Sequence, residues 1–180
     1  AECVLPTLVF PSSRLPVFPS SGLRVPELPD IVVYCEALLR HVVGRTLERV
    51  RLSNPFLLRS VTPPIDAIVG RPVVDVRRMG KRIILDFGDG LFLVVHLMIA
   101  GRLRWRAVGG KVPAKLGIAY FDFPNGVLIL TEAGTKRRAS LTLVQGEAAL
   151  AAIDRGGLEP LEATHAAFAE RLRRENHTLK

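Results

Sequence analysis

From Leu28 to about Arg45, apolar residues recur at steps of three and four positions, which is the period of one face of an α-helix. Gly44 ends the pattern, as glycine often ends a helix. The pattern therefore predicts an amphipathic helix that packs on a core, with Cys35 among its buried residues. The residues on its apolar face are Leu28, Val32, Cys35, Leu38, Leu39 and Val42.

The rest of the chain is dominated by short segments with strand-like patterns, separated by turn residues. Asp89-Gly90 and Asn125-Gly126 are typical of tight hairpin turns. Hairpin strands framed by helices at both ends predict the α+β class, as an antiparallel β-sandwich flanked by helices. The predicted strands are 46–52, 73–78, 82–87, 91–97, 102–106, 117–123, 127–131 and 140–144, and the predicted helical segments are 65–69, 147–153 and 164–175.

Residues 1–25 follow neither period and are interrupted by four prolines. We expect a disordered leader and leave open whether it belongs to the mature protein. A valine codon at Val25 can serve as a bacterial start, and removal of its methionine would expose Pro26. We place one domain at 26–160 and the start of a second, truncated one at 161–180.

The chain has 180 residues, of which 48% are hydrophobic, and a formal net charge of +8. This composition supports a folded core, and the charge favours a polyanionic partner. Two cysteines are too few for a zinc site or a disulfide framework. The histidines lack metal-ligand spacing, and we interpret His41, His165 and His177 as surface residues. No apolar run is long enough to span a membrane, so we expect a soluble, intracellular protein.

Basic residues gather in three stretches, 77–82, 102–106 and 136–138, which we interpret as basic turns, although 102–106 is also predicted to be a strand. Basic turns that contain glycine can approach nucleic-acid phosphates closely. Three such stretches in one small, basic domain favour phosphate binding over the alternative of an ordinary solvated surface.

His96, Met98 and Ile99 follow a predicted strand and precede a small-residue turn, Ala100-Gly101. An exposed apolar pair in such a place can wedge between DNA bases, whereas the alternative places both residues in the core. His96 is a candidate phosphate contact, although a lone histidine on a strand is more often packed.

The stretch PELPD, from Pro26 to Asp30, puts a proline and a carboxylate directly before the predicted helix. One interpretation is a helix-initiating proline, whose missing N–H costs nothing there. The other is chemical: as a first residue, Pro26 would carry a secondary amine able to attack a sugar aldehyde carbon and form an iminium, with Glu27 moving protons. An α-amine of pKa near 8 is about 10% neutral at pH 7, against about 0.04% for an ordinary lysine.

Five stretches, PELPD, RRMGKRIILDF, HLMIAGRL, GGLEPLE and RENHTLK, resemble the N-terminal half of the formamidopyrimidine-DNA glycosylase/endonuclease VIII family, from Pro26 to Lys180. The resemblance implies a base-excision-repair DNA glycosylase with AP-lyase activity. Its partner would be double-stranded DNA with a damaged base or an abasic site. It also implies a monomer in the bacterial cytoplasm, associated with nucleoid DNA. Oxidised purines such as formamidopyrimidine and 8-oxoguanine are the expected substrates, with oxidised pyrimidines left open.

By the same resemblance, Pro26 is the amine nucleophile, Glu27 the general acid/base, and Lys81 a phosphate contact that assists elimination. We therefore expect these three residues and the His96–Gly101 turn to converge on one face. One residue of the apolar pair would fill the gap left by the flipped base, and one of two arginines would reach the orphaned base. The implied DNA-binding residues are His96, Met98, Ile99, Arg137, Arg138, Asn176 and Lys180.

The chain departs from the family pattern at two motifs and at its end. HLMIAG replaces the usual HLGMSG and puts Ile99 in the place of methionine, and TEAGTKRR replaces a TDPRRF-like turn. The family's helix–two-turn–helix domain and zinc ribbon would follow Lys180, so we expect no cofactor or metal in this chain and zinc only in a longer protein. Two hypotheses remain: a catalytic domain whose protein begins at Pro26, or a non-catalytic DNA-binding module of the same fold. In the second, residues 1–25 block the proline amine or the C-terminal domain is missing.

Overall fold

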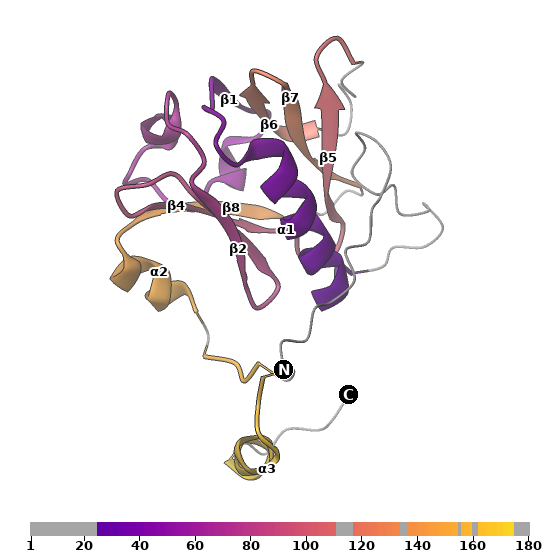
Figure 1. Ribbon diagram of the computed structural model, residues 1–180, viewed down its shortest axis with the longest axis vertical. Helices are drawn as coiled ribbons and strands as arrows, with labels where there is room; N and C mark the ends of the chain where they lie inside the picture. Colours follow the sequence, from indigo (N-terminus) through magenta and orange to yellow (C-terminus); the bar gives the residue numbers. More distant parts are fainter. Residues whose placement is uncertain (1–24, 111–116, 134–136, 155, 160–161, 175–180) are drawn as a thin grey trace, which may run out of the picture.

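The computed structural model describes residues 25–110, 117–133, 137–154, 156–159 and 162–174. Two antiparallel four-stranded sheets, of strand order β1-β6-β7-β5 and β2-β3-β4-β8, form a sandwich (Figure 1). This architecture confirms the predicted fold class. The strands are β1 (Arg49–Leu52), β2 (Asp75–Met79), β3 (Arg82–Asp86), β4 (Leu91–His96), β5 (Gly101–Ala107), β6 (Gly117–Phe123), β7 (Gly126–Glu132) and β8 (Ser140–Gln145). The helices are α1 (Leu28–Val42), α2 (Glu147–Ile153) and α3 (His165–Arg174), with short 3-10 helices η1 (Pro55–Leu57) and η2 (Ile65–Ile68).

Helix α1 packs on β2 and β3 and reaches the edge strand β5. Ile31, Leu38 and Val42 on its inner face are fully buried. Burying a side chain of this size contributes roughly 1.5–3 kcal/mol. A hydrogen bond joins Tyr34 to the backbone of Leu103, so the helix also covers part of the β5 edge, which exposes backbone groups in an open sheet.

The buried face of α1 is shifted around the helix from the face that the sequence pattern predicts, because Ile31, Tyr34 and Ala37 are buried as well. Cys35 is buried, as predicted, with 8% of its surface exposed. Val32 and Leu39 lie at the rim of the contact and are 37% and 42% exposed. The helix also ends at Val42, before Gly44, because the Gly44 N–H donates to the Val73 carbonyl instead of continuing the helix.

The turn between β6 and β7 lies one residue earlier than predicted. Gly126 pairs with Phe123, so Pro124 and Asn125 form the turn. Gly126 is needed for packing, because a Cβ there would lie 2.7 Å from the ring of Trp105. The Asn-Gly signal was therefore correct for a hairpin but wrong in register.

The register of the β2-β3-β4-β8 sheet defines two opposite ends. Arg82, His96 and Ser140 are cross-strand partners in one row. The β2–β3 turn, the β4–β5 turn and the segment before β8 therefore lie at one end, which we call the Lys81 end. The chain turns between β3 and β4 at the other end, which we call the Asp89 end.

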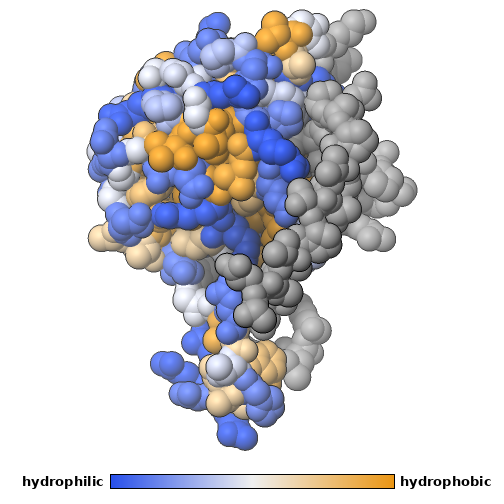
Figure 2. Space-filling view, in the orientation of Figure 1, coloured by the Kyte–Doolittle hydropathy of each residue, from blue (hydrophilic) through white to orange (hydrophobic). Residues whose placement is uncertain are grey.

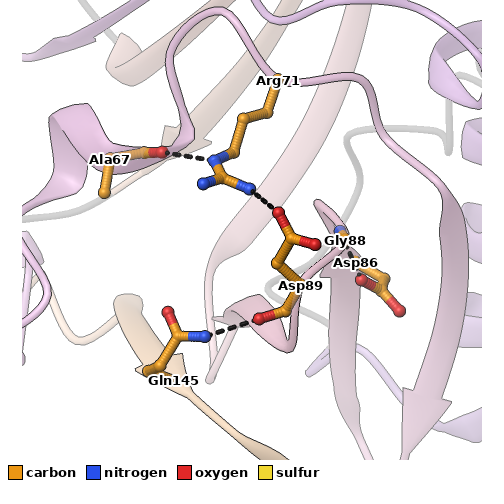
Figure 3. A network of polar contacts seen from close by, with 6 residues as sticks. All are labelled: Ala67, Arg71, Asp86, Gly88, Asp89 and Gln145. Atoms are coloured by element: carbon orange, nitrogen blue, oxygen red, sulfur yellow. Dashed lines mark hydrogen bonds and ion pairs between the residues drawn. The ribbon is translucent and has the colours of Figure 1, made fainter.

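The Asp89 end is closed by long-range polar contacts (Figure 3). Asp89 and Gly90 have φ values of 51° and 71°, which confirms the predicted two-residue hairpin turn. Arg71 Nη1 lies 2.9 Å from Asp89 Oδ2, and Gln145 Nε2 donates to the Asp89 carbonyl at 2.6 Å.

Two predictions about surface residues are wrong. His41 is half-buried and stacks on Trp105, with ring centroids 4.7 Å apart. Residues 102–106 belong to β5, which confirms the strand predicted there and shows that this basic stretch is not a turn; its Trp105 is buried. His165 is exposed, as predicted, and His177 lies outside the described residues.

Figure 2 shows apolar patches between polar residues on the visible face. Among the residues that the structure describes, no helix is long and apolar enough to cross a membrane. The predicted disordered leader falls outside the described residues, except for Val25.

Candidate functional site

Pro26 and Glu27 stand at the start of α1. Pro26 is buried, whereas Glu27 is exposed. The Glu27 N–H donates to Asp30 Oδ2 at 2.8 Å, and the Glu27 carbonyl accepts from the N–H of Ile31 at 3.1 Å. Asp30 therefore fixes the backbone of Glu27 against the helix. Sequence reasoning noted Asp30 only as part of PELPD, although a carboxylate three residues after a helix N-cap is a recognisable capping signal.

Lys81 lies at the tip of the β2–β3 hairpin. Gly80 before it has a φ of 56°, a conformation that glycine adopts without strain. Lys81 Nζ lies 2.5 Å from Glu27 Oε2, although the two residues are distant in sequence. Both side chains are about half exposed, at 51% and 57%, so solvent screens this ion pair and its stabilising contribution is small. This ion pair matters because it places the Lys81 amine beside the Glu27 carboxylate.

The turn from His96 to Gly101 presents an apolar surface beside Lys81. Ile99 is 40% exposed, so the core alternative is wrong for this residue. Met98 is half-buried and has a φ of 55°, in the left-handed region that side chains rarely adopt. The turn is closed by the Gly101 N–H, which donates to the Leu97 carbonyl at 2.9 Å.

A pocket of about 240 Å³ lies between these segments. Together with the Lys81–Glu27 contact, it confirms the prediction that Pro26, Glu27, Lys81 and the His96–Gly101 turn converge on one face. Within the described ranges, no group of three histidine, cysteine or acidic residues could hold a metal ion. The pocket is lined by Val25, Pro26, Lys81, His96, Leu97, Met98 and Ile99.

Arg137 and Arg138 are exposed and precede β8 at the Lys81 end. Sequence reasoning missed the residue that anchors them. Glu132 is 2% exposed, and its Oε1 accepts the N–H groups of Arg138 and Ala139 at 2.8 and 3.1 Å. This buried carboxylate joins the end of β7 to the segment before β8, and so sets where the two arginines emerge. Asn176 and Lys180 lie outside the described residues.

The basic hairpin is not the free phosphate-binding cluster that its sequence suggests. Arg77 pairs with Glu147, and Arg78 with Glu159. Arg82 donates to the Ile153 carbonyl at 3.0 Å. The arginines of this hairpin therefore contact α2 and the residues after it. Lys81 is the basic residue of the hairpin that lines the pocket.

Comparison with known sequences identifies the source of these features. The sequence model of the formamidopyrimidine-DNA glycosylase N-terminal domain matches residues 25–142. A formamidopyrimidine-DNA glycosylase of Variovorax paradoxus is 34% identical over 162 residues, which are 82% of this chain and 56% of the relative. Another, from an Acidovorax species, is 31% identical over 146 residues, with 76% and 50% of the two chains covered. The chain therefore spans about half the length of the curated relatives it matches.

Solved structures share the fold. Lactococcus lactis Fpg in complex with abasic-site DNA superposes with a TM-score of 0.70 at 22% identity, over 83% of this chain and 55% of that one. MutM in complex with DNA that contains carbocyclic 8-oxo-G superposes with a TM-score of 0.64 at 21% identity, over 71% and 47%.

Proposed function

Because the chain belongs to the formamidopyrimidine-DNA glycosylase family, we propose that it is the catalytic domain of a base-excision-repair DNA glycosylase with AP-lyase activity. Its substrates are oxidised purines, such as formamidopyrimidine and 8-oxoguanine, in double-stranded DNA. One observation supports this proposal above others: Pro26 and Lys81 line one pocket with an exposed apolar turn, and Glu27 contacts Lys81. The relatives' printed names and the DNA in the neighbouring structures point the same way.

In this proposal the chemistry begins at Pro26, as the first residue of the mature protein. Its neutral nitrogen attacks C1′ of the damaged nucleotide, the glycosidic bond breaks, and the base leaves with a proton. The sugar ring opens, and the nitrogen and C1′ share an iminium double bond. Loss of a proton from C2′ then expels the 3′-phosphate and nicks the strand.

The neighbouring residues support each step. Glu27 moves protons between the sugar and solvent, and Asp30 holds its backbone in place. Lys81 leaves Glu27 for the phosphate beside the lesion, which offers a second anionic partner. Base flipping costs a few kcal/mol, and Met98 or Ile99 offsets part of this by filling the gap in the stack. Arg137 or Arg138 reaches the orphaned base.

A second candidate is a non-catalytic DNA-binding module. The observation in its favour is that Val25 precedes Pro26 and lines the same pocket. In that arrangement the Pro26 nitrogen is an amide with no lone pair to give, so it cannot form an iminium with a nucleotide sugar.

Borohydride trapping distinguishes the two candidates. In a protein of the relatives' full length that begins at Pro26, borohydride should produce a covalent adduct with abasic-site DNA, because it reduces an iminium. The same protein with residues 1–25 retained should give no adduct. Pro26→Gly should keep partial trapping, since glycine also supplies a terminal amine. Glu27→Gln should lose base excision more than trapping on a preformed abasic site. Equal trapping with and without residues 1–25 would assign the nucleophile elsewhere, with Lys81 the first to test.

A further inference from the structure

Both flanks of the Lys81 tip are tied to the end of α2 or to the residues that follow it. Arg78 Nη2 lies 2.6 Å from Glu159 Oε2. Arg82, which directly follows Lys81, donates from Nη1 to the Ile153 carbonyl at 3.0 Å. Two arginines that bracket the tip therefore contact the same short stretch of chain, although 71 and 81 positions separate the partners.

The two contacts grip the hairpin from opposite faces. In the β2–β3 register, Arg78 lies opposite Ile83, and Met79 lies opposite Arg82. Because neighbouring residues of a strand point to opposite faces, Arg78 and Arg82 project from different faces of the hairpin. On the Arg82 face, Met79 and Ile153 pack with an apolar cluster that includes Leu150 of α2. On the other face, Ile83 belongs to the main core. The chain after α2 thus passes from one face of the hairpin to the other.

The Arg78–Glu159 ion pair is less exposed than a neighbouring ion pair on the same hairpin. Arg77 and Glu147 lie 3.2 Å apart, and their side chains are 42% and 72% exposed. Pairs this exposed contribute little. The side chains of Arg78 and Glu159 are only 23% and 33% exposed, and their contact is a short, charge-assisted hydrogen bond. The Glu159 carboxylate raises the pKa of Arg78, and the Arg78 guanidinium lowers the pKa of Glu159, as expected for two charges that stabilise each other.

We propose that Glu159 is a positioning residue for Lys81. Through Arg78 it holds the hairpin tip so that the Lys81 amine stays at the pocket beside Glu27. The value of this placement for DNA rests on the proposed function, but the placement itself can be measured without DNA.

The first test measures the Lys81 amine in the 180-residue chain with an acylating reagent and peptide mass spectrometry. Glu159→Gln should raise the acylation rate of Lys81 about threefold or more, because a released tip spends less time paired with Glu27. Glu147→Gln is the matched control, since it makes the same charge change in the partner of another arginine of this hairpin, Arg77, and should leave the rate unchanged. Exchanging the charges, with Arg78→Glu and Glu159→Arg together, should restore the slow rate that Arg78→Glu alone loses. Equal rates in the Glu159 and Glu147 variants, with unchanged melting temperatures, would overturn the proposal.

The second test uses the sign of the effect on DNA binding. Removing an acidic residue normally strengthens binding to a polyanion, and Glu147→Gln should do so slightly. Glu159→Gln should instead weaken binding to an abasic-site duplex and lower the slope of log K against log salt by about one, as if one phosphate contact were lost. Tighter binding by Glu159→Gln would contradict the proposal, because a freed Arg78 would then be the new contact. A chain that binds no DNA would count against the proposed function, while the acylation rates would still decide the role of Glu159.

Discussion

The two ends of the β2-β3-β4-β8 sheet are built from the same kind of tight turn but differ in what surrounds it. At both ends β3 enters or leaves through a tight turn with a positive-φ glycine and a charged residue, Lys81 or Asp89. At the Asp89 end other parts of the chain brace the turn, although the Asp89 side chain itself is 85% exposed. Arg71 and Gln145 contact Asp89, and the Gly146 N–H donates to the Gly90 carbonyl at 2.7 Å.

At the Lys81 end the flanks are held, but the tip faces a pocket. The Lys81 ion pair is half exposed, and Ile99 beside it is exposed. Met98 is held in a conformation that costs energy outside glycine. The comparison teaches that turn chemistry alone does not mark a site. Both turn residues are exposed, and what distinguishes the two ends is which parts of the chain contact the turn and that Lys81 lines a pocket.

The largest expected effect is a difference in the labelling rate of Cys35 between the native and the unfolded chain. It tests whether the Lys81 end stays folded in the native protein. Cys35 lies buried in α1, close enough to Arg78 to sense its charge, and burial raises the pKa of the thiol from 9.0 to about 11. Two pKa units reduce the thiolate fraction about 100-fold, so iodoacetamide at pH 8 should label native Cys35 at least about 100-fold more slowly than the unfolded chain. Labelling is followed by mass spectrometry in a Cys3→Ser background. Fast labelling of native Cys35 would show that the Lys81 end unfolds locally. The two ends of the sheet would then differ in how tightly they are packed, and not in which residues contact their turns.

The second prediction separates the ends by function. Lys81→Ala should cost about 1.5–3 kcal/mol of DNA-binding free energy, as for a hydrogen bond to a charged group. The salt slope should fall by about one. Asp89→Ala should leave binding unchanged or slightly stronger. Fluorescence anisotropy with an abasic-site duplex measures both, and equal losses at the two ends would break the comparison.

The third prediction separates the ends by stability. Asp89→Val should destabilise the fold by about 1–2 kcal/mol, because a β-branched residue is strained in the left-handed region. The exposed contact with Arg71 adds little to this loss. Lys81→Ala should change stability by less than about 0.5 kcal/mol, as expected for an exposed position. Urea unfolding measures both variants. A larger loss at Lys81 than at Asp89 would mean that the pocket end supports the fold.

The smallest effect concerns acid. Burial lowers the pKa of His41, and the charges of Arg40 and Arg45 lower it further. A histidine with a depressed pKa contributes stability that is present above its unfolded pKa of 6.5 and is lost as the pH falls from there through the folded pKa. His41→Phe keeps an aromatic ring on Trp105 and should reduce this acid loss, by less than about 1 kcal/mol. Because His41 stacks on the other sheet, the loss should be the same in Lys81→Ala and Asp89→Ala; a difference between them would link acid sensitivity to one end.

The sandwich, α1 and most strands could be predicted because burial on one face leaves a local period in the sequence. The Asp89-Gly90 turn could be predicted because its requirement is also local: two positive φ values demand particular residues. The Pro124-Asn125 turn was misplaced because the requirement for Gly126 comes from the Trp105 ring, which belongs to another strand. Local signals of this kind report that a glycine is needed but not why.

The candidate site was predictable from the resemblance in PELPD and HLMIAGRL, and its convergence at one pocket is confirmed. The catalytic and DNA-binding roles of these residues stay predictions. The partners of the site were not predictable. Glu159 meets Arg78 across 81 positions, and Glu132 looks like an ordinary acidic residue until the fold buries it. Such contacts depend on which surfaces the sheets bring together, and no periodic pattern records that.

The place of Val25 has a practical consequence for anyone who produces this protein. The residue bonded to the Pro26 nitrogen lines the pocket together with Lys81 and Met98. Under the proposed function, a purification tag or a protease remnant left ahead of Pro26 would keep that nitrogen an amide while the sandwich folds normally. Folded material of this kind would give no borohydride adduct. For the trapping experiment, tags therefore belong on the other terminus, with the initiator methionine placed directly before Pro26.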